Sequence, residues 1–102
     1  MTNYLLLYRA DPEAMAAMPQ PTPEEGAAMM EAWNAWAARA GDALLDFGNP
    51  TIAVSPSADR SVGGYSQIQA EDFAAAERLL EGHPHSMMGG TIDVYEITPI
   101  SM

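Results

Sequence analysis

The segment from Gly63 to His85, GGYSQIQAEDFAAAERLLEGHPH, constrains the fold most, because it contains a strand pattern, a helix pattern and both histidines. From Tyr65 to Ala70 the side chains alternate, which predicts a half-buried strand with one polar face. Asp72 is a suitable helix N-cap. Gly82 followed by Pro84 predicts that the helix ends there and does not resume. The segment therefore predicts a strand, a helix and a sharp stop.

Two further segments carry clear patterns. Tyr4 to Tyr8 is apolar at every position, which predicts a central strand covered on both faces. Thr22-Pro23-Glu24-Glu25 has the residues of a capping box with proline at the first helical position, and predicts a helix that runs to about Ala40. On this helix Trp33 and Trp36 face the same way. We interpret them as core residues rather than as part of a cofactor site.

Shorter strands complete the pattern. Ala43 to Phe47 predicts a short strand that could resume at Thr51 to Val54, and Thr91 to Thr98 predicts the last strand, with a bulge or an exposed end near Glu96. The order of elements is β, α, β, β, α, β. It predicts an α+β, ferredoxin-like antiparallel sheet with both helices on one face, in a single domain over residues 1–102.

The predicted helices can cover only one face of the sheet. The sequence places on the other face Tyr65, Gln67, Gln69, Asp93 and Tyr95, with Tyr4, Leu6 and Tyr8 as the contribution of the first strand. A face that mixes aromatic rings with hydrogen-bonding groups is too apolar for water and too polar for a dry core. We therefore expect it to pack against the sheet of a second copy, giving a homodimer with a lined cavity.

Charge and composition exclude several function classes. The chain has 14 acidic residues against 4 basic ones, a net charge of −10, which would repel nucleic acid and anionic membrane surfaces. There is no cysteine, hence no disulfide, thiolate nucleophile or cysteine metal site. The opening MTNYLLLYRADPE has too short an apolar run for a signal peptide or a membrane span, so we expect a cytoplasmic protein.

The two histidines are the first candidates for chemistry. His83 and His85 flank Pro84, and either imidazole could carry a proton near neutral pH. The structural alternative is a cap or a dipole partner at the end of the helix. The pair could also ligate a metal, but no third ligand is evident, so we expect neither a metal nor a cofactor.

Charged and polar strand residues form the second group of candidates. Asp46 or Asp93 could orient His85 or carry a proton themselves in a partly dry cavity; the alternative is a solvated strand end or a hydrogen bond to Tyr or Gln. Arg9 would hold an anionic group or pair with Asp11 or Asp93. The remaining predicted ligand-binding residues are Tyr8, Tyr65, Gln67 and Tyr95.

The chain resembles the YCII-related proteins, a family of small domains that form dimeric α/β barrels. The resemblance lies in NYLLLYR, GDALLDFGNP, GGYSQIQAEDFAAAERLLEGHPH and GGTIDVYEITP, while the DGPF segment of some members is missing. Some relatives pair a histidine on the first helix with an aspartate, one of them for dehydrochlorination of an aromatic ring. The first helix here has Met30, Glu31, Trp33 and Asn34 in that region and no histidine, so this pair does not transfer.

The leading hypothesis is a small-molecule-binding dimeric barrel with lyase- or isomerase-type proton transfer. In it His85 carries the proton and Asp46 or Asp93 orients the imidazole. The alternative is a non-catalytic dimerisation or ligand-sensing module, which the missing helix histidine favours. A third hypothesis, a metal-dependent oxygen-using barrel, requires a further ligand beside the two histidines.

Overall fold

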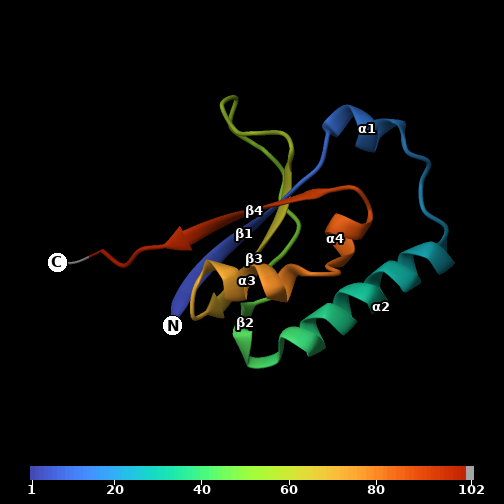
Figure 1. Ribbon diagram of the computed structural model, residues 1–102. Coiled ribbons are helices and arrows are strands. Elements are labelled where there is room, and N and C mark those ends of the chain that lie inside the picture. Colours follow the sequence, from blue (N-terminus) through green and yellow to red (C-terminus); the bar gives the residue numbers. More distant parts are fainter. Residues whose placement is uncertain (101–102) are drawn as a thin grey trace.

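An antiparallel sheet with strand order β2-β3-β1-β4 carries all the helices on one of its faces (Figure 1). The computed structural model describes residues 1–100. The elements are β1 (Thr2–Arg9), α1 (Pro12–Ala17), α2 (Pro23–Ala40), the 3-10 turn η1 (Gly41–Ala43), β2 (Leu44–Asp46), β3 (Val62–Ala70), α3 (Phe73–Leu80), α4 (Pro84–Met87) and β4 (Thr91–Ile97). The predicted ferredoxin-like arrangement is confirmed.

The central strand β1 places its two faces opposite to the prediction. Tyr4, Leu6 and Tyr8 are buried beneath the helices, whereas Leu5 and Leu7 lie on the open face. Leu5 pairs with Gln67 and Tyr95, and Leu7 pairs with Tyr65 and Asp93. Every residue from Tyr4 to Tyr8 is apolar or aromatic, so the alternation that identifies the buried face of β3 is absent from β1.

The open face of the sheet otherwise has the predicted composition. Its members on β3 and β4 are Tyr65, Gln67, Gln69, Asp93 and Tyr95. Tyr95 is 53% exposed, and the rest are partly buried by their neighbours. No described helix covers this side in Figure 1.

The helix α2 is held at both ends and through its middle. Thr22 and Glu25 form the predicted capping box, and Gly41 ends the helix with a φ of 56°. Trp36 is 2% exposed, and its Nε1–H donates to the carbonyl of Leu79, 2.8 Å away, which joins α2 to α3. Burial of an indole of this size contributes several kcal/mol, roughly 25 cal/mol per Å².

One predicted strand segment is absent, and the choice left open for the end of the last strand is resolved. Thr51 to Val54 forms no strand, and Ile52 and Val54 are exposed; one bridge joins Pro50 to Gly64. At this bridge the N–H of Tyr65 donates to the carbonyl of Asn49 (3.4 Å) and the N–H of Thr51 donates to the carbonyl of Gly63 (3.0 Å), and no strand continues toward Val54. The ladder between β1 and β4 runs without a bulge, so the break in pattern near the end of β4 is an exposed strand end.

The segment after α3 also differs from the prediction. Gly82 has the expected left-handed conformation, with a φ of 70°. Pro84 nevertheless begins a short helix, α4, for which His83 is the N-cap. A proline at the first helical position loses no hydrogen bond, so Pro84 starts a helix as readily as it ends one. Phe73, the first residue of α3, is 51% exposed. No helix within residues 1–100 has both the length and the apolarity to cross a bilayer.

The closest backbone approach in the fold generates a stability prediction. Gly48 has a φ of 79°, and a Cβ there would lie 1.8 Å from the carbonyl oxygen of Tyr65. We expect Gly48→Ala to lower the free energy of unfolding by roughly 2 kcal/mol or more, because the loop must leave β3. Urea denaturation measures this, with Gly26→Ala as the control, since nothing lies within 4 Å of Gly26. Equal stability of the two variants would contradict the contact.

Candidate functional site

A cavity of about 670 Å³ opens on the helix side of the sheet. Its walls consist of aromatic rings and methionines: Tyr8, Trp33, Phe47, Met15, Met29 and Met30. His85 and Asn49 supply the polar side chains apart from the tyrosines, and glycine backbone from β3 and its preceding turns completes the lining. Both the volume, which falls in the range of about 300–1,000 Å³, and the mainly apolar lining are typical of small-molecule sites.

Four segments distant in sequence bring the rings of the cavity together. Tyr8 is near the end of β1, Trp33 is on α2, Phe47 follows β2 and His85 is on α4. The rings of Tyr8 and Trp33 meet edge to face at 5.0 Å between centroids, and those of Trp33 and Phe47 are 6.1 Å apart. Such contacts fix ring orientations beyond what burial alone achieves, so the aromatic wall is preorganised.

Beside the cavity, a chain of hydrogen bonds runs through the core from His83. The backbone N–H of His85 donates to Nδ1 of His83 (3.0 Å), so in the neutral ring Nε2 carries the proton and donates to the hydroxyl of Tyr8 (3.2 Å). Tyr8 donates to Oγ of Ser66 (2.7 Å). Ser66 donates in turn to the carbonyl of Phe47 (2.6 Å). Every polar side-chain atom in this series of hydrogen bonds therefore has a partner.

The environment keeps the first two members of this chain neutral. His83 is fully buried, and its ring centroid lies 4.7 Å from that of Trp33 and 4.3 Å from that of Trp36. Burial, followed by the charges of His85 and Arg39, lowers the pKa of His83 to about 4. Burial raises the pKa of Tyr8 to about 12, against the opposing effect of its bond to Ser66. With both of its ring nitrogens engaged, His83 has none free for a ligand.

His85 differs from His83 in having one unengaged nitrogen. Its Nε2 lies 2.8 Å from the carbonyl oxygen of Arg9, which can only accept, so Nε2 carries a proton. In the neutral ring Nδ1 then has the lone pair, and within residues 1–100 it has no hydrogen-bond partner. The cavity lining includes no Asp, Glu, Lys or Arg. His85 is thus the lining residue whose imidazole has an unengaged nitrogen that can accept a proton.

The predicted charged residues lie elsewhere. The guanidinium of Arg9 bonds Asp93 and Asp59, each at 2.9 Å, and Oγ of Ser61 at 2.8 Å, so one of its two expected pairings is present. The bond to Asp93 and the charges of both aspartates raise the pKa of Arg9, and hydrogen bonds from Ser61 lower the pKa of Asp59. Asp46 accepts from the N–H of Gly48 at 2.8 Å.

The structure therefore separates the predicted site residues. Tyr8, Tyr65 and His85 line the cavity. Gln67, Asp93 and Tyr95 are on the open face of the sheet, and neither Asp46 nor Asp93 bonds His85. No group of three or more His, Asp or Glu side chains within residues 1–100 is arranged to hold a metal ion.

Sequence reasoning missed several residues of the site. Trp33 was expected in the core, and Phe47 and the methionines were not considered as cavity walls. Ser66 carries the one recognisable signal. It carries a hydroxyl on the buried face of β3, the same face as Ile68 and Ala70. A buried hydroxyl requires a hydrogen-bond partner.

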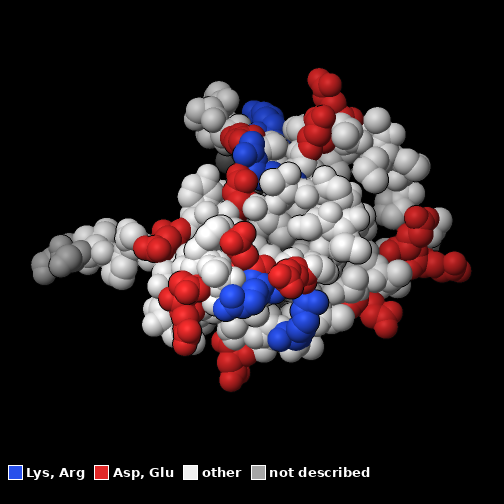
Figure 2. Space-filling view, in the orientation of Figure 1, with Lys and Arg blue, Asp and Glu red and all other residues white. Residues whose placement is uncertain are grey.

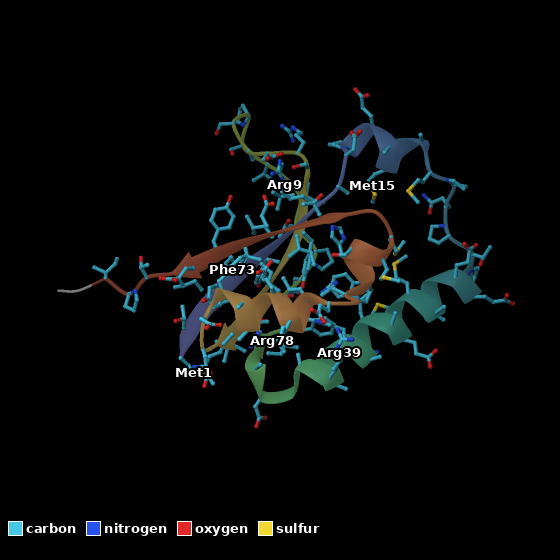
Figure 3. The ribbon with its side chains drawn as sticks, viewed as in Figure 1. Met1, Arg9, Met15, Arg39, Phe73 and Arg78 are labelled. Atoms are coloured by element: carbon cyan, nitrogen blue, oxygen red, sulfur yellow. The ribbon has the colours of Figure 1, made fainter. Side chains whose placement is uncertain are left out.

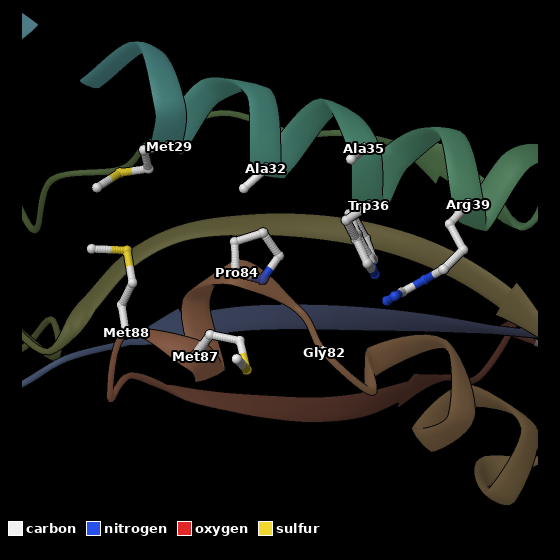
Figure 4. Close-up of a pocket in the computed structure, with 9 residues that line it drawn as sticks. All are labelled: Met29, Ala32, Ala35, Trp36, Arg39, Gly82, Pro84, Met87 and Met88. Carbon is white, nitrogen blue, oxygen red and sulfur yellow. The ribbon is translucent and has the colours of Figure 1, made fainter. Parts of the chain in front are cut away.

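A second hollow, of about 460 Å³, runs along the other side of α2 against the segment from Gly82 to Met88 (Figure 4). Met29 belongs to both walls. Ala32, Pro84 and the methionines make this hollow apolar, and Arg39 lies at one end, where it donates to the carbonyl of Glu81. It has no histidine in its lining, so we place the candidate site in the larger cavity.

The surface charge does not gather at either hollow. Figure 2 shows carboxylates dispersed over the visible face, with arginines in two separate places. Figure 3 locates one of these places at Arg39 and Arg78, on neighbouring helices, and the other at Arg9, the last residue of β1. The molecule shows no broad cationic surface for a polyanion in this view.

Comparison with known proteins identifies the fold. No family model matches the chain, and no curated protein matches it in sequence. Among solved structures it is similar to 5-chloro-2-hydroxyhydroquinone dehydrochlorinase from Burkholderia phenoliruptrix AC1100, in complex with 2,5-dihydroxybenzoquinone. The TM-score is 0.61 at 15% sequence identity, over 94% of this chain and 93% of that chain. At this identity the likeness establishes a shared fold.

The lowered pKa of His83 predicts a pH dependence of stability. The folded state resists protonation of this histidine until about pH 4, whereas the unfolded chain binds the proton near pH 6.5. The resulting stabilisation is complete above pH 6.5 and is lost as the pH falls from 6.5 to 4, by roughly 3 kcal/mol at about 1.4 kcal/mol per pH unit. Urea denaturation of the wild type and of His83→Gln at several pH values isolates it by difference. Parallel pH profiles would contradict the assignment.

Proposed function

We propose that this chain is a YCII-related dimeric α/β-barrel protein of the cytoplasm that binds a small, uncharged, aromatic organic molecule in the larger cavity. The observation that carries the proposal is a preorganised aromatic cavity with one imidazole and no charged carboxylate, ammonium or guanidinium in its lining. Transfer of an unpaired charge into such a site is costly, which favours a neutral ligand. The structurally similar dehydrochlorinase was solved with a quinone bound, which agrees with a planar ligand.

Within this cavity His85 is the proposed proton acceptor. Its Nδ1 lone pair would accept the proton of an acidic O–H or C–H of the ligand, giving an imidazolium and the conjugate anion of the ligand, and the imidazolium would return the proton at another atom of that anion. Removal of a proton at one atom and its return at another is the acid–base chemistry of a lyase or an isomerase, and it needs no cofactor. Because neither Asp46 nor Asp93 bonds His85, the hypothesis that one of them orients it is replaced by orientation through the backbone of Arg9.

A non-catalytic ligand-sensing module is the second candidate. Two observations favour it: α2 has no histidine, and within residues 1–100 His85 has no acidic partner that would stabilise an imidazolium. In this case the same cavity binds the same class of ligand without turnover. The two candidates share the ligand test below and differ in whether the ligand is released unchanged.

The proposed homodimer forms through the open face of the sheet. Leu5 and Leu7 add apolar area to a face that already carries two tyrosines, and such a surface gains from burial against a second copy. The cavity opens on the opposite, helical side, and among residues 1–100 it shares only Tyr65 with the open face, so each protomer would keep its own site. This arrangement makes dimerisation and ligand binding separable.

The ligand prediction compares phenol, toluene and benzoate at pH 8. Phenol should bind the wild type about tenfold more tightly than toluene, because its O–H donates to Nδ1 of His85, worth about 1.4 kcal/mol. Benzoate should bind more weakly than phenol, because its charge has no partner in the cavity. His85→Phe should bind phenol and toluene alike. Calorimetric titration gives the affinities, and equal binding of phenol by the wild type and His85→Phe would contradict the role of His85.

The dimer prediction uses the centre of the open face. Leu7 pairs with Tyr65 on one side and Asp93 on the other, so Leu7→Arg should convert the dimer to a monomer while leaving phenol binding unchanged. Ala38→Arg, on an exposed part of α2, is the matched control and should remain dimeric. Sedimentation equilibrium reports the mass. A wild type that is monomeric at high concentration would exclude this interface.

A further inference from the structure

We propose that Gly90 is a positioning residue for His85. The backbone at Gly90, together with the carbonyl of Arg9, holds the imidazole in one orientation and in the Nε2–H tautomer, which leaves Nδ1 as the basic atom. The importance of Gly90 for ligand binding rests on the proposed function, whereas its contact with the ring of His85 does not.

Gly90 lies directly against the ring of His85. A Cβ built on Gly90 would be 2.3 Å from Nε2, 2.5 Å from Cε1 and 2.6 Å from Cδ2 of His85. These are its three nearest heavy atoms, so the side chain of His85 occupies the space that any larger residue would need. Gly90 is not among the residues with positive φ, and its backbone conformation is open to any residue. The requirement for glycine here is therefore one of space.

The remaining contacts fix the ring from other directions. Nε2 of His85 donates to the carbonyl of Arg9 at 2.8 Å, and the centroid of the Tyr8 ring is 5.3 Å from that of His85. The backbone of His85 is held as well, because its N–H donates to Nδ1 of His83 (3.0 Å) and its carbonyl accepts from the N–H of Gly90 (3.0 Å). The imidazole consequently has little freedom to rotate.

Arg9 is itself fixed in the sheet. The register between β1 and β3 shifts between Tyr8 and Arg9, and a shift of this kind reorients the backbone at one residue. The guanidinium of Arg9 is held by Asp59 and Asp93 at 2.9 Å each. The carbonyl of Arg9 therefore contacts His85, while the two aspartates neutralise its guanidinium away from the cavity.

The first test measures the tautomer of the His85 imidazole by nitrogen-detected NMR in the free protein. With two histidines in the chain, both rings are assignable. The wild type should show His85 as the Nε2–H tautomer. Gly90→Ala should displace the ring and lose that signature, and Gly26→Ala, with nothing within 4 Å, should keep it. An unchanged tautomer and unchanged ring shifts in Gly90→Ala would overturn the proposal.

The second test is a double-mutant cycle for stability, which remains informative if Gly90→Ala perturbs folding. If the added methyl conflicts with the ring, Gly90→Ala should lower Tm in the wild type but not in His85→Ala, where the space is vacant. Equal losses in both backgrounds would show that Gly90 serves the backbone alone and would overturn the proposal. Neither test uses a ligand, so absence of phenol binding would count against the proposed function and not against this assignment.

Discussion

The buried hydrogen-bond chain from His83 through Tyr8 and Ser66 to the carbonyl of Phe47 is the constraint on which the rest of the structure depends. Polar groups in a core of this kind are costly unless each finds a partner. Satisfying them in order places α4, β1, β3 and the turn after β2 at fixed distances from one another. That placement leaves the cavity between them, with the ring of Tyr8 as part of its wall.

The same series of hydrogen bonds gives the two histidines different roles. His83 is neutral, fully buried and engaged at both nitrogens, so it acts as a structural element and a helix cap. His85, two residues on, lines the cavity and uses one nitrogen for the carbonyl of Arg9, while its other nitrogen has no hydrogen-bond partner within residues 1–100. Identical side chains thus differ in chemistry because burial and hydrogen bonding differ, not because of sequence context.

The sequence predicts the fold where local signals and the pattern of burial agree. The capping box at Thr22, the N-cap at Asp72 and the alternation of β3 each specify an element without reference to the rest of the chain. The facing of β1 was predicted wrongly, because apolar residues fill both of its faces and only pairing with β3 and β4 distinguishes them. Pro84 was ambiguous for a similar reason, since a helix stop and a helix start use the same residue.

The candidate site was less predictable than the fold. Its polar residues were nominated singly, and which of them meet depends on strand facing. The pairing of Arg9 with Asp93 was one of the expected alternatives, but Asp93 is thereby engaged away from His85, which it was also expected to orient. The aromatic wall could not be separated from the core in sequence, because both require large apolar side chains at helical spacing. Gly90 carried no local signal, since the reason for glycine lies in a ring five residues earlier.

The central claim is that the larger cavity, with His85 as its base, is where a small uncharged aromatic molecule binds. The most direct measurement is NMR mapping of phenol binding with nitrogen-detected shifts of both histidines. We predict saturable shifts at Nδ1 of His85 and the indole of Trp33, with the His83 nitrogens little changed. Shifts confined to the hollow at Met87 and Met88, or none at saturating phenol, would contradict the account.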